Sequence, residues 1–141
     1  MTMNQSMFKS LKIAFWNARS LRDTKIYEVT SIMKDENISL LGVAETFKIF
    51  NSELEHIDFR RNGKVFTGLN HRNGRRGLVS MRDKNFPIQF LPREFITQEE
   101  FQLICGLLQN VLLVYVYVPN GSLSQPTKLL ITTLERLISK Y

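Results

Sequence analysis

The segment LKIAFWNARSLRDTKIYEVTSIMKDENISLLGVA, residues 11–44, decides the fold because it runs through strand, helix and strand patterns in turn. Residues 11–17 are apolar and rich in β-prone side chains, which predicts a strand. After a polar loop, apolar residues recur at three- and four-residue spacing in 24–36, which predicts a helix. Residues 38–44 are apolar on both faces, as in a strand buried inside a sheet. We therefore expect two parallel strands joined by a right-handed helical crossover.

The centre of the chain carries short β-type runs separated by turn residues. Asn73-Gly74 predicts a tight hairpin turn, so we expect antiparallel pairing there. The run VLLVYVYV is almost entirely β-branched, aromatic or leucine and predicts the best-defined strand of the chain. The strands predicted in this part are residues 64–68, 77–82, 87–91, 101–108 and 111–118.

The last part of the chain predicts a helix over residues 126–140. Pro126 fits its first turn, where a missing N–H is harmless, and leucines form one apolar stripe along it. Together the patterns predict an α/β (α+β) fold, with a mixed, mostly antiparallel sheet covered by two helices. We expect one domain, residues 11–141, after a flexible N-terminal arm, residues 1–10.

Composition excludes several classes of protein. The 141 residues include 43% hydrophobic and 23% charged residues, close to the globular average, which excludes wholesale disorder. A single cysteine, Cys105, excludes an internal disulfide framework and is expected to be buried and inert. No apolar run is long enough to span a membrane, and the N-terminus lacks the apolar core of a signal peptide. We therefore expect an intracellular protein, nuclear or cytoplasmic, without a membrane partner.

The basic charge belongs to one segment. Residues 60–84 hold eight Lys and Arg residues and one Asp, a net charge of +7, whereas the whole chain carries +6. Such a cluster favours a nucleic acid as partner, with Arg72, Arg75 and Arg76 as candidate contacts to phosphates. A solvated hairpin that binds nothing is the alternative.

Three polar motifs stand where predicted strands end. The first strand ends in Trp16-Asn17, the second is followed by Glu45-Thr46, and the long apolar strand ends in Tyr-Val-Pro-Asn, residues 117–120. This order and spacing resembles the N-terminal half of the endonuclease/exonuclease/phosphatase superfamily. Within it, the chain is most similar to apurinic/apyrimidinic endonucleases and to the endonuclease domain of non-LTR retrotransposons.

The resemblance implies a metal-dependent hydrolase that cuts phosphodiester bonds, with DNA as the favoured substrate. It implies Mg²⁺ as cofactor and Glu45 as its ligand, with Asn17 orienting the metal or contacting phosphate. It implies that Tyr117 donates a hydrogen bond to the phosphate and that Asn120 has a supporting role. From the residues alone, Asn17 also fits a turn, Glu45 an ordinary surface carboxylate and Tyr117 the core. The two histidines, His56 and His71, are expected at the surface.

The resemblance also implies parts that this chain lacks. Family members carry an Asp-x-Asn motif and an Asp-His pair farther along, but no Asp follows Asp83 and no His follows His71 here. We therefore expect about half of a four-layered α/β-sandwich and little activity alone. One hypothesis is a fragment of a nuclease, such as a truncated retroelement product. A second is a binding module for nucleic acid or protein, with an exposed sheet face that self-associates or takes the missing half. A third is an unrelated small α/β domain.

Overall fold

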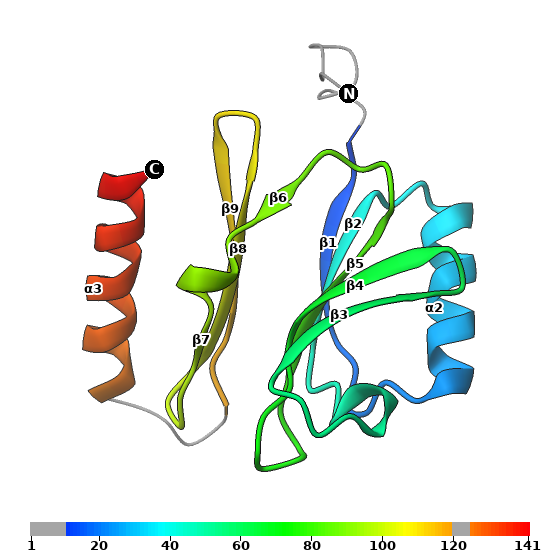
Figure 1. Ribbon diagram of the computed structural model, residues 1–141, viewed down its shortest axis with the longest axis horizontal. Helices are drawn as coiled ribbons and strands as arrows, with labels where there is room; N and C mark the ends of the chain where they lie inside the picture. Colours follow the sequence, from blue (N-terminus) through cyan, green and yellow to red (C-terminus); the bar gives the residue numbers. More distant parts are fainter. Residues whose placement is uncertain (1–10, 120–124) are drawn as a thin grey trace.

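The fold has four layers, in the order helix, sheet, sheet, helix (Figure 1). A computed structural model describes residues 11–119 and 125–141. The N-terminal arm expected at residues 1–10 lies outside the described residues. Neither helix in the described part of the chain is long and apolar enough to cross a membrane.

The first sheet contains the predicted strand–helix–strand unit. Strands β1 and β2 pair in parallel and are joined by helix α2 (Asp23–Asp35), while the remaining neighbours pair antiparallel. The strand order is β1-β2-β5-β4-β3, so β1 and β3 form the two edges. The five strands are β1 (Ile13–Asn17), β2 (Leu40–Ala44), β3 (His56–Arg61), β4 (Lys64–Leu69) and β5 (Leu78–Asp83).

The second sheet is built around one central strand. β8 (Gln102–Leu108) pairs along one edge with the short strands β6 (Gln89–Phe90) and β7 (Ile96–Thr97), and along the other with β9 (Val111–Tyr117). Helix α3 (Gln125–Lys140) covers the outer face of this sheet. Two single-turn 3₁₀ segments, η1 (Ile49–Asn51) and η2 (Pro92–Glu94), complete the described elements.

The α+β fold class, the mostly antiparallel pairing and the two covering helices are confirmed. The strands nevertheless divide into two sheets, and the faces that meet bury each other. The expectation of an uncovered inner sheet face therefore does not hold. Strand β3, HIDFRR, was not predicted from the sequence. It lies at a sheet edge, and its exposed charged side chains hide the alternation of apolar and polar residues that marks a strand.

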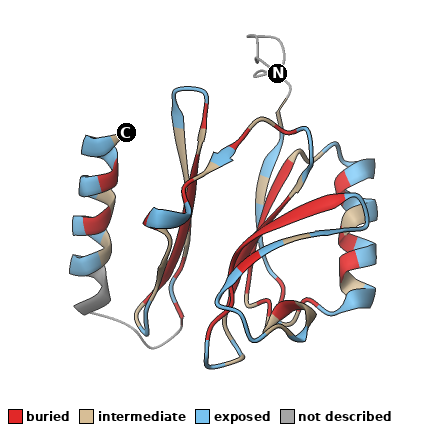
Figure 2. Ribbon diagram, in the orientation of Figure 1, coloured by how far each residue is buried: buried red, intermediate tan, exposed pale blue. Residues whose placement is uncertain are grey.

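Three apolar clusters hold the layers together, and Figure 2 shows buried residues along the inner stripe of each helix. Helix α2 buries Ile26, Val29 and Met33 against the first sheet. Helix α3 buries Leu137 against the second sheet, beside Leu103 and other residues of β8. The cluster between the sheets unites residues of β2, β4, β5, β8 and β9: Leu40, Ala44, Leu69, Leu78, Ile104, Leu108, Tyr115 and Tyr117 among others.

Tyr115 fixes the two sheets relative to each other. Its hydroxyl donates a hydrogen bond to the backbone oxygen of Ala14 in β1, at 3.1 Å. Its ring lies on Gly42 of β2, where an added Cβ would come within 2.6 Å of the ring carbons. Because a side chain at position 42 would collide with the ring, this contact requires glycine. Tyr115 thereby sets the position of Tyr117, two residues along the same strand and on the same face.

A buried carboxylate anchors the last helix. The Glu94 side chain is only 5% exposed and accepts hydrogen bonds from Arg136 at 3.0 Å, Lys140 at 2.9 Å and the Tyr141 hydroxyl at 2.7 Å. The Tyr141 hydroxyl contributes most, followed by Lys140, and these contacts lower the pKa of Glu94 to about 2. The carboxylate is therefore ionised at neutral pH and holds α3 on η2.

Candidate functional site

Three of the predicted site residues meet at one end of the sandwich. Asn17 ends β1, Glu45 follows β2 and Tyr117 ends β9, so two sheets contribute. The Asn17 amide Nδ2 donates to Glu45 Oε2 at 2.9 Å, and the Tyr117 hydroxyl donates to the same oxygen at 3.1 Å. Asn17 lies 28 positions before Glu45 and Tyr117 lies 72 positions after it, yet both donate to the same Glu45 oxygen. The fourth predicted residue, Asn120, lies outside the described residues.

Backbone contacts on both sides hold Glu45 in place. Its φ of 55° lies in the left-handed region and turns the chain sharply after β2. Its N–H donates to the Gly77 oxygen at 2.9 Å, and its own oxygen accepts from the Ser20 N–H at 2.7 Å. Glu45 thus bridges the loop after β1 and the start of β5, which sets the direction of its side chain.

Lys25 shapes the loop after Asn17, and the sequence reasoning missed it. Its ammonium group donates to the backbone oxygens of Ala18 at 2.8 Å, Ser20 at 3.0 Å and Arg19 at 3.3 Å. A cation in the first turn of a helix opposes the helix dipole, so it gains from a specific acceptor. That unfavourable position is the sequence feature from which a role for Lys25 could have been inferred.

Tyr117 is poised to donate a hydrogen bond. Its side chain is buried, and burial together with the bonded Glu45 carboxylate raises its pKa to about 12. The phenol therefore stays protonated at neutral pH. Asn17 is exposed and Glu45 half-buried, so the site opens to solvent on the side of β1. Among the described residues, Glu45 Oε1 has no hydrogen-bond partner.

Gln102 supports the site from beneath. Its Oε1 accepts a hydrogen bond from the Gly77 N–H at 2.9 Å, and its Nε2 donates to Thr97 Oγ1 at 3.0 Å. Gly77 has a φ of 124°, and an added Cβ would collide with the buried hydroxyl of Thr46. Position 77 therefore requires glycine for both its backbone conformation and its surroundings.

The three arginines of the predicted nucleic-acid contact lie in the β4–β5 loop and differ in their partners. Arg72 and Arg76 bind the Glu99 side chain, at 2.7 Å and 3.5 Å. The exposed Arg75 side chain makes no hydrogen bond or ion pair within the described part of the chain. His71, expected at the surface, is instead buried, and burial followed by the Arg76 charge lowers its pKa.

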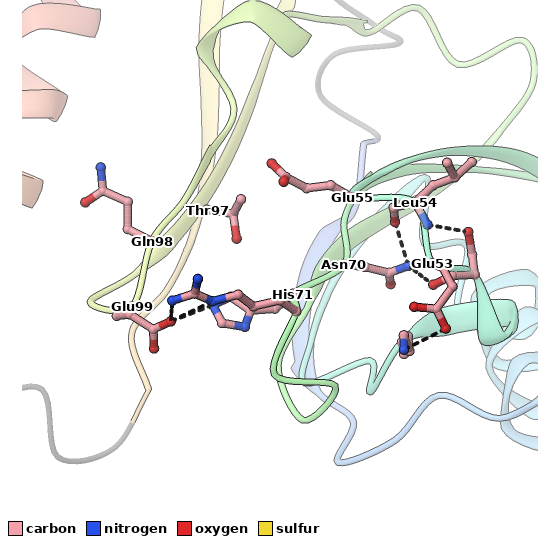
Figure 3. Close-up of a pocket in the computed structure, with 11 residues that line it drawn as sticks. Glu53, Leu54, Glu55, Asn70, His71, Thr97, Gln98 and Glu99 are labelled. Carbon is pink, nitrogen blue, oxygen red and sulfur yellow. Dashed lines mark hydrogen bonds and ion pairs between the residues drawn. The ribbon is translucent and has the colours of Figure 1, made fainter.

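A cavity of about 450 Å³ opens beside this loop, between η1, the end of β4 and the turn that joins β7 to β8 (Figure 3). Asn70 is one of the residues that line it. The Asn70 side chain accepts from the Ile49 N–H at 3.1 Å and donates to the Ser52 and Leu54 oxygens, each at 3.0 Å. All of its lining residues except Leu54 are polar or charged. They include Lys48, Glu53, Glu55, His71, Arg72 and Glu99.

The donor set at the strand ends suits a hard cation in part. Glu45 Oε1 and Asn17 Oδ1 are oxygen donors left over after the hydrogen bonds to Glu45 Oε2, and Mg²⁺ is commonly held by one or two protein oxygens plus water and phosphate. In residues 11–119 and 125–141, no three His, Cys, Asp or Glu side chains gather as a metal cluster. The residues present thus fit a cation that takes most of its ligands from elsewhere.

Neither a protein-family model nor a curated protein sequence matches the chain. The contacts among Asn17, Glu45 and Tyr117 are therefore the observations that bear most directly on function.

Proposed function

We propose that Asn17, Glu45 and Tyr117 form part of a Mg²⁺-dependent phosphodiesterase site of the endonuclease/exonuclease/phosphatase type, acting on DNA. The observation that carries this proposal is the meeting of two donors, from β1 and β9, on Glu45 Oε2. A structural role accounts for one hydrogen bond from a buried tyrosine hydroxyl, whereas a metal- and phosphate-binding role accounts for the convergence of all three side chains at the strand ends.

Each residue has a chemical role in this proposal. Glu45 Oε1 and Asn17 Oδ1 would hold the cation, which when bound withdraws charge from a phosphoryl oxygen. The Asn17 and Tyr117 hydrogen bonds fix the Glu45 carboxylate, so its free oxygen needs little reorganisation to bind. The Tyr117 hydroxyl stays protonated at neutral pH, and its single hydrogen bond would switch from Glu45 Oε2 to the phosphate oxygen as negative charge develops there, leaving the Asn17 amide to hold Glu45.

We expect this chain by itself to bind the cation and phosphate without hydrolysing the diester. Hydrolysis requires a base to activate water, and loss of a general acid or base costs roughly 10²–10⁴ in rate. The motifs that supply these groups in the family, Asp-x-Asn and Asp-His, are absent from residues 1–141. Among the described residues, Glu45 is the carboxylate that contacts Asn17 and Tyr117.

A binding module is the second candidate function, and the edge strands β1 and β9 favour it. β1 and β9 each leave one edge without a neighbouring strand in the described structure. Apolar side chains are exposed there, with Phe15 at 47%, Ile13 at 41% and Val111 at 40%. Unpaired strand edges of this kind pair with other strands. A second copy of the chain, or the C-terminal half that the resemblance implies, would supply them.

Two assays on the purified chain test the proposal. The first follows binding of fluorescein-labelled duplex DNA by anisotropy, with and without Mg²⁺. The second follows nicking of supercoiled plasmid. We expect Mg²⁺ to tighten DNA binding and Glu45→Gln to abolish that gain, with no nicking by any variant. Glu28→Gln, an exposed carboxylate on α2, changes the charge equally and is the matched control. Equal Mg²⁺ dependence in Glu45→Gln and wild type would remove the proposed site.

A further inference from the structure

Glu99 sits within a cluster of cations. It lies in the turn between β7 and β8, while its partners lie in the β4–β5 loop of the other sheet. Glu99 Oε1 is 2.7 Å from Arg72 Nη2 and accepts a second hydrogen bond from Arg72 Nε at 3.2 Å. Figure 3 shows the Glu99 carboxylate directed toward His71, whose Nε2 lies 3.9 Å from Oε1.

Arg76 approaches Glu99 from the other side. Its Nη1 donates to the Glu99 backbone oxygen at 2.6 Å and lies 3.5 Å from Oε2. The Arg76 side chain is only 19% exposed, so its direction is well defined.

The arrangement has the chemistry of an occupied anion site. Two guanidinium groups and an imidazole N–H surround one carboxylate, and paired arginines hold phosphate oxygens by the same charge-assisted hydrogen bonds. The Asn73 N–H donates to His71 Nδ1 at 2.9 Å, so the neutral ring carries its proton on Nε2, which hydrogen-bonds the Gln98 backbone and lies 3.9 Å from Glu99 Oε1. The contacts lower the pKa of Glu99, with the Arg72 hydrogen bond as the largest cause, so the carboxylate is charged at neutral pH.

We propose that Arg72, Arg76 and His71 form a phosphate-binding site that Glu99 occupies as an internal competitor. A nucleic-acid phosphate would displace the Glu99 carboxylate and take over its hydrogen bonds. This inference rests on the proposed function, because it assumes nucleic acid as the ligand. It goes further in naming where a phosphate binds and what limits its affinity.

The exposure of Glu99 makes displacement feasible. Its side chain is 53% exposed and that of Arg72 is 83% exposed, so the pair is weak and can exchange with solvent. A polyanion offers several phosphates at once and releases counterions on binding. Glu99 is therefore expected to weaken nucleic-acid binding without blocking it.

Removing the Glu99 charge tests the proposal. We would measure binding of fluorescein-labelled duplex DNA against KCl concentration for wild type, Glu99→Gln and Glu100→Gln. Glu100 is the adjacent residue, and its side chain makes no hydrogen bond or ion pair within the described part of the chain. Both substitutions raise the net charge by one. We expect Glu99→Gln to bind about 3- to 10-fold more tightly than Glu100→Gln. Its salt dependence should be steeper by about 1–2 in slope, because two more cations reach phosphates.

The same comparison in a protein without the two arginines tests whether the effect of Glu99→Gln depends on them. In an Arg72→Gln/Arg76→Gln protein, we expect Glu99→Gln to have no more effect than Glu100→Gln. Should Glu99→Gln fail to fold, Glu99→Asp keeps the charge, shortens the reach of the carboxylate and should also tighten binding.

The outcomes separate this inference from the proposed function. Equal affinities for the Glu99 and Glu100 variants, with the wild type binding DNA, would overturn the competitor and leave nucleic-acid binding intact. An effect of Glu99→Gln that persists without the arginines would also overturn it. No binding by any variant would remove both proposals. Binding by Glu99→Gln alone would support the competitor strongly.

Discussion

Glu45 is restrained from both sides of the site, by the Asn17 amide and by the Tyr117 hydroxyl. The sequence places all three residues at the ends of predicted strands, and the structure brings those ends together. The motif order could therefore be used to predict the site. The supporting residues could not be found in this way, because Lys25 and Gln102 act through contacts with loops that local patterns do not describe.

The hydrogen bond between Tyr117 and Glu45 should be visible in the ionisation of Tyr117. Burial and Glu45 raise the pKa of Tyr117 to about 12, so ultraviolet titration should show one tyrosine that ionises near pH 12 and is absent in Tyr117→Phe. In Glu45→Gln the carboxylate charge is gone but burial remains, so this pKa should fall part of the way toward 10. An unchanged titration in Glu45→Gln would show that the two groups do not interact in solution.

Among the elements, β9 contributes both to the apolar cluster between the sheets and to the candidate site. Its bounds were predicted to within one residue, because a run of β-branched and aromatic residues strongly favours a strand. The pairing of the sheets through Tyr115 was not predicted. Gly42 looks like any glycine in a strand until the ring that lies on it is known.

Gly42→Ala tests that contact. The added methyl group would meet the Tyr115 ring at 2.6 Å, so we expect a loss of about 1–3 kcal/mol in the free energy of unfolding. Tyr115→Phe removes the hydrogen bond to Ala14 and should cost about 1 kcal/mol. Denaturant unfolding measures both. If Gly42→Ala lowers the free energy of unfolding as much in a Tyr115→Leu protein as in wild type, the Tyr115 ring is not the reason that position 42 requires glycine.

The Glu94 cluster gives a pH-dependent prediction for α3. The folded pKa of Glu94, about 2, lies below its ordinary value of 4.5, so the carboxylate stabilises the fold above pH 4.5. We expect Glu94→Gln to lower the free energy of unfolding by about 1–2 kcal/mol at pH 7. The difference from wild type should narrow as the pH falls from 4.5 toward 2. A difference that stays constant over this range would contradict the lowered pKa.

For the whole molecule, the α+β class and the two covering helices were predicted, whereas the division of the strands into two sheets, and so the four layers, was not. Local patterns identify strands, yet they do not say which sheet a strand joins. β6 and β7 have two paired residues each, and their register is set by β8 rather than by their own sequence. That β1 and β9 are edge strands also emerges only from the complete strand order.

Those edge strands predict association that depends on protein concentration. Charges on edge strands oppose pairing, so Ile13→Lys together with Val111→Lys should shift the protein toward the monomer in sedimentation velocity. Tyr27→Lys with Ile32→Lys adds the same charge at exposed positions of α2 and should have less effect. Equal behaviour of the two double variants would assign any association to overall charge or to another surface.

Glu45, held by Asn17 and Tyr117, is proposed to bind a divalent cation. Paramagnetic broadening by Mn²⁺ in ¹H–¹⁵N spectra tests it most directly, because broadening reports distance from the ion. We predict that the Asn17 side-chain amide and the backbone signals of Glu45 and Gly77 broaden first in wild type and in Glu28→Gln, and that Glu45→Gln removes this pattern. Broadening that is centred elsewhere, or that survives Glu45→Gln, would show that Glu45 does not bind the cation.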